Sequence, residues 1–366
     1  MTQLYRIDRT WEWNLRNSPL AADQVQDGAD EAAIPSCDTS GFRWCGLPVA
    51  SPLGIAAGPL LNSGWLLQAA NEGFDILVYK TVRSQARSCY PLPNLVPVDI
   101  PNELTGDQVL QASATMSGSW AVSFGMPSQS SDVWTADVQF ARRHLPAGKV
   151  LVVSVVGTQD PTITDPRQSL EALADDFALC ARMAVESGAD GIEANFSCPN
   201  VSTTDGQLYQ NPEAAGLVSQ RIRNAIGQTP LVLKIGRVTR IEEAAALVQH
   251  TAATIHGLAM TNSVTARVCD ESGRQLFGGE RRGICGDAIR TASLEQTTMF
   301  RKLLQDRHRH LDLIGVGGIS TFEHVQEYLA AGAQSVGIAT AAMRIPNLGV
   351  QLKTRFTNWN SSFSDR

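Results

Sequence analysis

Short apolar runs and longer amphipathic stretches take turns along most of the chain. The apolar runs are rich in β-branched residues and have the length of buried strands, whereas the stretches between them repeat apolar residues at helical spacing. Strands are predicted at residues 52–58, 75–81, 150–157, 190–194, 231–234, 255–263, 311–318 and 334–339, and helices at residues 65–72, 136–144, 170–187, 212–226, 241–251 and 321–331. This sustained alternation predicts an α/β fold, a parallel (β/α)8 TIM barrel.

The barrel pattern occupies residues 47–345 and leaves a part of the chain on either side. Residues 1–46 lack a regular pattern, and we expect an irregular N-terminal arm packed by its aromatic residues; residues 346–366 form a C-terminal tail. Residues 82–135 are too long for an ordinary connection and indicate an inserted active-site lid, in which we also place the apolar run 120–123. The length suits one domain with insertions.

Composition and charge narrow the class of protein. Hydrophobic residues make up 43% and charged residues 18% of the 366 residues, which suits a globular protein with a sizeable core. The net charge of −6 gives no general attraction for nucleic acid or for an anionic membrane. The seven cysteines contain no C-x-x-C pair, so the sequence predicts neither a disulfide framework nor a metal site. The first residues lack the apolar core of a signal peptide, and we expect a cytoplasmic protein.

The stretch Asn195-Phe196-Ser197-Cys198-Pro199-Asn200 follows a predicted strand and carries the first candidate chemistry. Catalytic groups of such barrels stand at the carboxyl ends of the strands. The thiol of Cys198 could act there as a nucleophile or proton acceptor, and the amides of Asn195 and Asn200 could bind a polar ring. The alternative is a buried, inert thiol in a turn, which is common for a lone cysteine.

Two other predicted strands end in residues suited to a ligand site. Residues 52–58 end in Ala56-Ala57-Gly58, small residues that let a flat ligand approach the backbone. Residues 75–81 end in Lys80-Thr81, which places a cation at the barrel mouth; the alternative is a surface lysine whose stem alone is buried.

Glycine-rich loops follow the last two predicted strands. Gly317-Gly318 and the later Ala339-Thr340 stand where such barrels commonly bind phosphate with bare backbone N–H groups. The segment 283–286, which ends in Gly286, could lie near the same phosphate or ring. None of the six histidines stands at a strand end, and we assign them no role.

Taken together, these motifs resemble the flavin-dependent dihydroorotate dehydrogenase family, in the family's order, over most of residues 46–345. The resemblance is to the soluble class, in which a cysteine at the position of Cys198 is the base; the membrane-associated, quinone-using class has serine there. It implies bound FMN, a small-molecule dihydropyrimidine substrate and hydride transfer to the flavin. We also expect a homodimer.

The resemblance also implies roles for individual residues. Cys198 and Lys80 would be catalytic, and Lys80 would contact both flavin and substrate. The substrate would be held by Lys80, Asn195, Asn200, Asn262 and Ser263. The flavin would be held by Ala56, Ala57, Gly58, Lys80, Thr81, Asn195, Lys234, Gly286, Gly317, Gly318, Ala339 and Thr340.

The lid departs from the family pattern. Where the family reads N-S-M-G-L-P-N, residues 122–128 read V-S-F-G-M-P-S, so Val122 and Ser128 replace two asparagines, one of which normally binds orotate. Ser123 or Ser128 could compensate, or the substrate could lack that group. We therefore keep two alternatives: an FMN-dependent dehydrogenase or reductase of a different cyclic amide in a biosynthetic pathway, and a flavin-binding subunit without turnover, which conflicts with the presence of Cys198 and Lys80.

Overall fold

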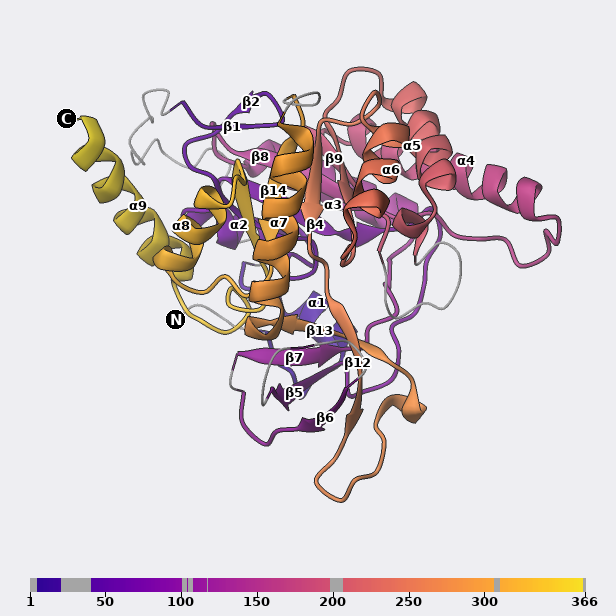
Figure 1. Cartoon of the computed structure of the whole chain (residues 1–366), viewed down its shortest axis with the longest axis horizontal. Helices are drawn as coiled ribbons and strands as arrows, with labels where there is room; N and C mark the ends of the chain where they lie inside the picture. Colours follow the sequence, from indigo (N-terminus) through magenta and orange to yellow (C-terminus); the bar gives the residue numbers. More distant parts are fainter. Residues whose placement is uncertain are drawn as a thin grey trace.

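The computed structural model describes residues 5–20, 41–100, 104, 108–116, 118–197, 207–305 and 310–364, and for residues 357–364 the helical backbone alone. Eight parallel strands close into a barrel in the order of the sequence (Figure 1). They are β3 (Leu53–Ile55), β4 (Ile76–Val82), β8 (Val150–Val155), β9 (Gly191–Asn195), β10 (Leu231–Lys234), β11 (Gly257–Met260), β14 (Asp312–Val316) and β15 (Ser335–Ile338). Each lies within or beside a predicted strand, and the predicted fold class is confirmed.

Helices surround the barrel, and four of them, α2, α4, α5 and α8, begin at a side-chain cap. In α4 and α5, Asp165 and Asn211 accept hydrogen bonds from the backbone N–H three residues on, and a proline follows at the first helical position. The helices are α2 (Ser63–Asn71), α3 (Ser131–His144), α4 (Pro166–Glu186), α5 (Pro212–Ile226), α6 (Ile241–Thr251), α7 (Arg290–Leu304), α8 (Phe322–Ala330) and α9 (Leu348–Ser364), with short 3-10 turns at Leu208–Gln210, Phe277–Gly279 and Asp287–Ile289.

Three helices were not predicted. α7 is rich in threonine and polar residues, and α9 occupies much of the stretch that we expected to be a tail. The third is α1 (Trp11–Arg16), so the prediction of an irregular N-terminal arm was wrong at these residues. It is one and a half turns long, and its stability depends on packing rather than on a periodic pattern. Within the described residues, no helix combines the length and the hydropathy needed to cross a membrane.

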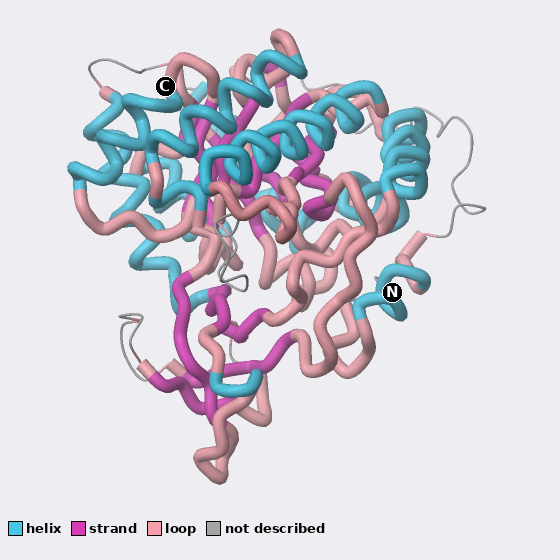
Figure 2. Tube along the Cα trace, turned by 90° about the vertical axis from the view of Figure 1, so that its right-hand side faces the viewer, coloured by secondary structure: helices cyan, strands magenta, loops and turns pink. Residues whose placement is uncertain are grey.

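A second, smaller sheet lies at one end of the barrel (Figures 1 and 2). Three of its strands, β5 (Leu95–Asp99), β6 (Val109–Ala112) and β7 (Ser119–Val122), come from the predicted lid. The other two, β12 (Val264–Cys269) and β13 (Arg282–Gly286), follow β11, where the sequence predicted no insertion. The lid therefore supplies three of the five strands of this closed sheet, and the other two follow about 150 residues later in the chain.

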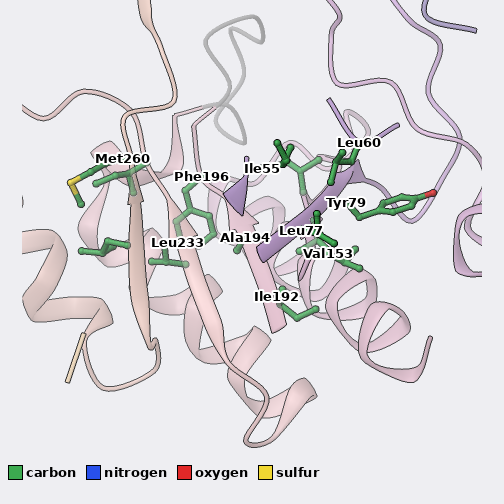
Figure 3. Packing of buried hydrophobic residues seen from close by; sticks show 14 of the residues in the cluster. Ile55, Leu60, Leu77, Tyr79, Val153, Ile192, Ala194, Phe196, Leu233 and Met260 are labelled. Atoms are coloured by element: carbon green, nitrogen blue, oxygen red, sulfur yellow. The ribbon is translucent and has the colours of Figure 1, made fainter. Parts of the chain in front are cut away.

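Side chains of the barrel strands alternate between two apolar layers. Leu77, Val153 and Ile192 belong to the layer between strands and helices (Figure 3), whereas Ile76 and Val152 belong to a separate cluster inside the barrel. The hairpin of β1 (Arg43–Trp44) and β2 (Leu47–Pro48) adds Trp44 to the inner cluster. A Cβ on Gly191 would lie 2.5 Å from the Trp44 ring, so the ring depends on glycine at this strand start.

α9 is attached to the amino-terminal side of the barrel by a buried ion cluster. Asp75, directly before β4, accepts hydrogen bonds from Lys149 at 3.0 Å, from Ser51 at 2.5 Å and from Lys353 of α9. The Asp75 side chain is 3% exposed and that of Lys353 is 21% exposed. Charged groups so enclosed require all their partners, because an unpaired buried charge is costly.

We expect Lys353→Met to lower the free energy of unfolding by about 1.5–3 kcal/mol, the usual contribution of a hydrogen bond to a charged group. Arg355→Met is the matched control on the same helix. This variant also removes a positive charge that is paired with a carboxylate, that of Glu323, but both side chains are more than half exposed. We therefore expect the free energy of unfolding to fall by only about 0–1 kcal/mol. Urea unfolding of both variants measures the difference; equal losses would show that the cluster does not hold α9.

Candidate active site

A cavity of about 250 Å³ opens at the carboxyl ends of the barrel strands, on the side of the second sheet. It brings together every predicted site residue that the structure describes, from the ends of seven of the eight barrel strands and from the end of β13 in the second sheet. These are Ala56, Ala57, Gly58, Lys80, Thr81, Asn195, Lys234, Asn262, Ser263, Gly286, Gly317, Gly318, Ala339 and Thr340. Cys198 and Asn200 lie outside the described residues.

A chain of buried polar groups runs across the barrel beneath this cavity. The hydroxyls of Thr81 and Ser154 are 2.9 Å apart, and Ser154 donates to Glu193 at 2.9 Å. Lys234 lies 3.6 Å from the same Glu193 carboxylate oxygen, and both side chains are 5% exposed. Lys80 adds a second buried ammonium group to the cavity wall. Lys80 and Lys234 both line the cavity, and their positive charge favours an electron-rich ligand.

Amide side chains at the ends of β9 and β11 are held in fixed orientations. Asn195 accepts from the backbone N–H of Ser197 at 3.1 Å and donates to the Met126 sulfur at 3.6 Å. Asn262 donates to the Ser197 carbonyl oxygen. The hydroxyl of the neighbouring Ser263 is buried and has no hydrogen-bond partner in the part of the chain that the structure describes. A buried polar group without a partner is costly, so Ser263 is suited to bind a ligand.

The glycine loops after β14 expose their backbone to the cavity. Gly317 and Gly318 have φ angles of 135° and 65°, a region that side-chain-bearing residues rarely adopt. A Cβ on Gly318 would also lie 2.6 Å from the Cβ of Arg290. Close by, Asp287 lines the cavity; burial raises the pKa of its carboxyl, and the charges of Arg290 and Arg344 oppose that shift. Bare backbone with two nearby guanidinium groups suits a phosphate.

Sequence reasoning placed the lid over the site but missed that residues near the N-terminus also form part of the cavity wall. Tyr5 and Trp11 of the N-terminal segment (residues 5–20) line it, together with lid residues such as Val122 and Phe124. The aromatic start of the sequence was the available signal, but it does not show which surface those rings cover. Ser123 and Ser128, the two residues considered as substitutes for the family asparagines, do not line the cavity.

Among the described cysteines, Cys285 is the one that lines the cavity. Its sulfur is 3.7 Å from the Asn262 carbonyl oxygen. Burial raises the pKa of this thiol to about 12, although the charge of Lys234 opposes the shift. A thiol that stays protonated at neutral pH is a poor base, so Cys285 is a structural neighbour rather than a candidate for proton removal.

Comparison with known proteins identifies the family. Residues 42–354 match the dihydroorotate dehydrogenase family. A dihydroorotate dehydrogenase of Dictyostelium discoideum is 30% identical over 95% of this chain and 96% of its own length. The catalytic subunit of a dihydroorotate dehydrogenase B (NAD(+)) from Thermoplasma acidophilum is 25% identical over 81% of this chain and 85% of its own. A protein with the same name from Latilactobacillus sakei is 30% identical over 47% of this chain and 54% of its own length. The family match and the first of these relatives both span nearly the whole barrel, and the chain belongs to the dihydroorotate dehydrogenase family.

Proposed function

We propose that this protein uses FMN to oxidise dihydroorotate or a closely related dihydropyrimidine, with Cys198 as the base. Family membership makes it an oxidoreductase acting on a CH–CH bond. The assignment of FMN and of individual residue roles rests mainly on one observation. The described residues that the resemblance assigns to flavin and to substrate are spread over 285 positions, from Ala56 to Thr340, and they line one cavity.

The cavity has features that fit FMN. Gly317 and Gly318 would bind the phosphate through backbone N–H groups, and Thr340 would add its hydroxyl. Gly58 and Ala57 leave room for a flat ring, and Lys234 would place a cation beside it. When bound, FMN supplies a ring that accepts a hydride from a saturated carbon. A cation beside that ring would favour its negatively charged reduced form.

The substrate would lie against the amides of Asn195 and Asn262 and the hydroxyl of Ser263. A dihydropyrimidine has alternating carbonyl and N–H groups, which match side chains that both donate and accept. The partnerless Ser263 hydroxyl supports this assignment. Asn200 is proposed from the resemblance alone, since it lies outside the described residues.

Cys198 would remove the proton from the ring carbon beside the carbonyl group. It follows Ser197, a buried residue on the cavity wall whose backbone is hydrogen bonded to Asn195 and Asn262. Positive charge lowers the pKa of a thiol, and Lys80 and Lys234 supply such charge to this cavity. Lys80 would in addition hold the anionic group of the substrate.

One observation favours a second candidate, oxidation or reduction of a different cyclic amide. Val122 lines the cavity where the family has asparagine, and its side chain can neither donate nor accept a hydrogen bond. A substrate without a polar group at this point would fit such a wall. The homodimer, the cytoplasmic location and the division into arm, barrel and tail stay predictions.

Thr340→Val tests the cofactor proposal. The variant keeps the shape of the side chain and removes the hydroxyl, and we expect flavin to bind about 10- to 100-fold more weakly, since hydrogen bonds to charged groups contribute about 1.5–3 kcal/mol. Titration of the flavin-free protein with FMN, followed by fluorescence quenching, measures this. Thr298→Val, which alters an exposed hydroxyl bonded to its own helix, should bind FMN as the unaltered protein does. If the unaltered protein and both variants bound FMN with equal affinity, the phosphate would lie elsewhere.

Cys198→Ala tests the base. We expect the variant to bind FMN and orotate normally but to reduce its flavin with dihydroorotate about 10²- to 10⁴-fold more slowly, the usual contribution of a positioned general base. Anaerobic stopped-flow absorbance measures the rate.

Cys285→Ser is the matched variant in the same experiment, because its thiol also lines the cavity but has a pKa of about 12. It should keep the rate within a few-fold. If Cys285→Ser were slow and Cys198→Ala fast, Cys285 rather than Cys198 would be the base. If both variants were fast, another group would remove the proton.

A further inference from the structure

The N-terminal segment is fixed to the barrel beside the cavity. Asn62, the N-cap of α2, donates to the Leu15 carbonyl oxygen at 2.8 Å, and the Trp65 indole N–H donates to the Asn14 carbonyl oxygen at 3.1 Å. Gly64 of α2 has no room for a Cβ, because the Leu20 carbonyl oxygen and the Ser18 side chain occupy that space. These contacts hold the segment against the loop that follows β3.

The same segment reaches the lid. The Tyr5 ring lies 6.4 Å from the Trp65 ring and meets the Phe124 ring edge-on at 6.2 Å. Phe124 is two residues beyond Val122, and both line the cavity. Tyr5 therefore joins the barrel side to the lid side across one edge of the cavity.

Trp11, the first residue of α1, also lines the cavity and is 6% exposed. Its indole N–H is buried and has no hydrogen-bond acceptor among the described residues, unlike that of Trp65. An indole nitrogen is a donor only, and enclosing it without an acceptor is unfavourable by about 1–3 kcal/mol. Such a donor on a cavity wall is suited to a ligand oxygen.

Trp11 shares this cavity with Lys80. Both side chains are buried on its wall, and Val122 and Phe124 of the lid line it as well. A ring ligand that fills the cavity would meet both the indole donor and the Lys80 ammonium group.

Other polar side chains of the adjoining lid are already engaged. Ser123 accepts from the Arg282 guanidinium at 2.9 Å. Ser128 accepts from the Arg83 backbone N–H at 3.0 Å and donates to the Gln129 carbonyl oxygen at 2.8 Å. Val122 offers no hydrogen bond. Among the described side chains that line this wall, the Trp11 indole N–H and the Tyr5 hydroxyl are thus buried without a hydrogen-bond partner, and of the two the indole can only donate.

We propose that Trp11 is a substrate-binding residue whose indole N–H donates a hydrogen bond to a carbonyl or carboxylate oxygen of the ring substrate. This inference rests on the proposed function, because it needs a ring ligand beside Lys80. It assigns the recognition of one substrate oxygen to the N-terminal segment rather than to the lid. The substrate class is then a cyclic amide that keeps an acceptor oxygen on the lid side, even though Val122 cannot bind it.

Trp11→Phe removes the donor and keeps an aromatic ring. Calorimetric titration with orotate should show binding about tenfold or more weaker than in the unaltered protein, in keeping with the loss of a hydrogen bond to a charged group. In turnover, KM should rise while kcat changes little, because the bond is made in both ground and transition states.

Two further variants keep the result decisive. β-(3-Benzothienyl)alanine at position 11 preserves the shape of tryptophan without the N–H, so it should weaken orotate binding as phenylalanine does even if Trp11→Phe folds poorly. Trp13→Phe alters the neighbouring ring, over which the Arg9 guanidinium lies at 5.7 Å, and should bind orotate normally.

The outcomes separate the inference from the proposed function. Normal orotate binding by both position-11 variants overturns the inference and leaves the proposed function intact. A lower melting temperature of the benzothienyl variant without ligand also overturns it, because the N–H would then have a structural acceptor. If the unaltered protein binds neither orotate nor dihydroorotate, the proposed function fails, and the inference fails with it.

Discussion

The strict alternation of side chains in a closed parallel barrel is the constraint on which the site depends. Residues that point inward from neighbouring strands meet in layers, and the register sets which ones meet: Ser154 pairs with Glu193, Glu193 with Val232, and Asn195 with Lys234. The lower interior is apolar, filled by side chains such as Ile76 and Val152 beneath these polar layers. Because the interior is closed, a charged side chain there must find its partner in the same layer or the next, as Lys234 finds Glu193 at 3.6 Å. The polar groups therefore gather where the strands end and a ligand can meet them.

This constraint explains how much the sequence could reveal. The apolar runs of the strands and the residues at their ends are local features of the sequence. They were sufficient to find Lys80, Asn195, Lys234 and the glycine pair at 317–318. The residues stand in one cavity because parallel strands in a closed barrel end at the same side. The Cys198 stretch was recognised by the same reasoning, although its geometry lies outside the described residues.

The parts that escaped prediction are those fixed by pairing across long sequence distances. β7 pairs with β13 so that Val122 lies opposite Gly283, and β6 pairs in parallel with β12, which places Val109 beside Arg267. No local sequence pattern in the lid shows which strands it pairs with. The sequence predicted that aromatic residues such as Tyr5 and Trp11 pack the arm, but not which surface they cover, and the Tyr5 ring packs against Trp65 of α2 and Phe124 of the lid. In both cases the structure is decided by contacts between residues far apart in the chain rather than by local secondary-structure propensity.

The division between barrel and added walls also bears on which ring the enzyme accepts. The proposed flavin chemistry would use Lys234 and the glycine loops, which stand at the ends of barrel strands. The lid wall is held from outside the barrel: Arg282 of β13 stacks on Tyr90 at 6.0 Å and on Phe277 at 5.4 Å while it donates to Ser123, the neighbour of Val122. A change in β13 or in the N-terminal segment can thus move the lid wall without disturbing the strand ends. Substrate choice in this fold can therefore change while the redox chemistry is kept. A valine at position 122 is compatible with such a change, because the hydrogen bonds that position the lid do not involve the side chain of residue 122.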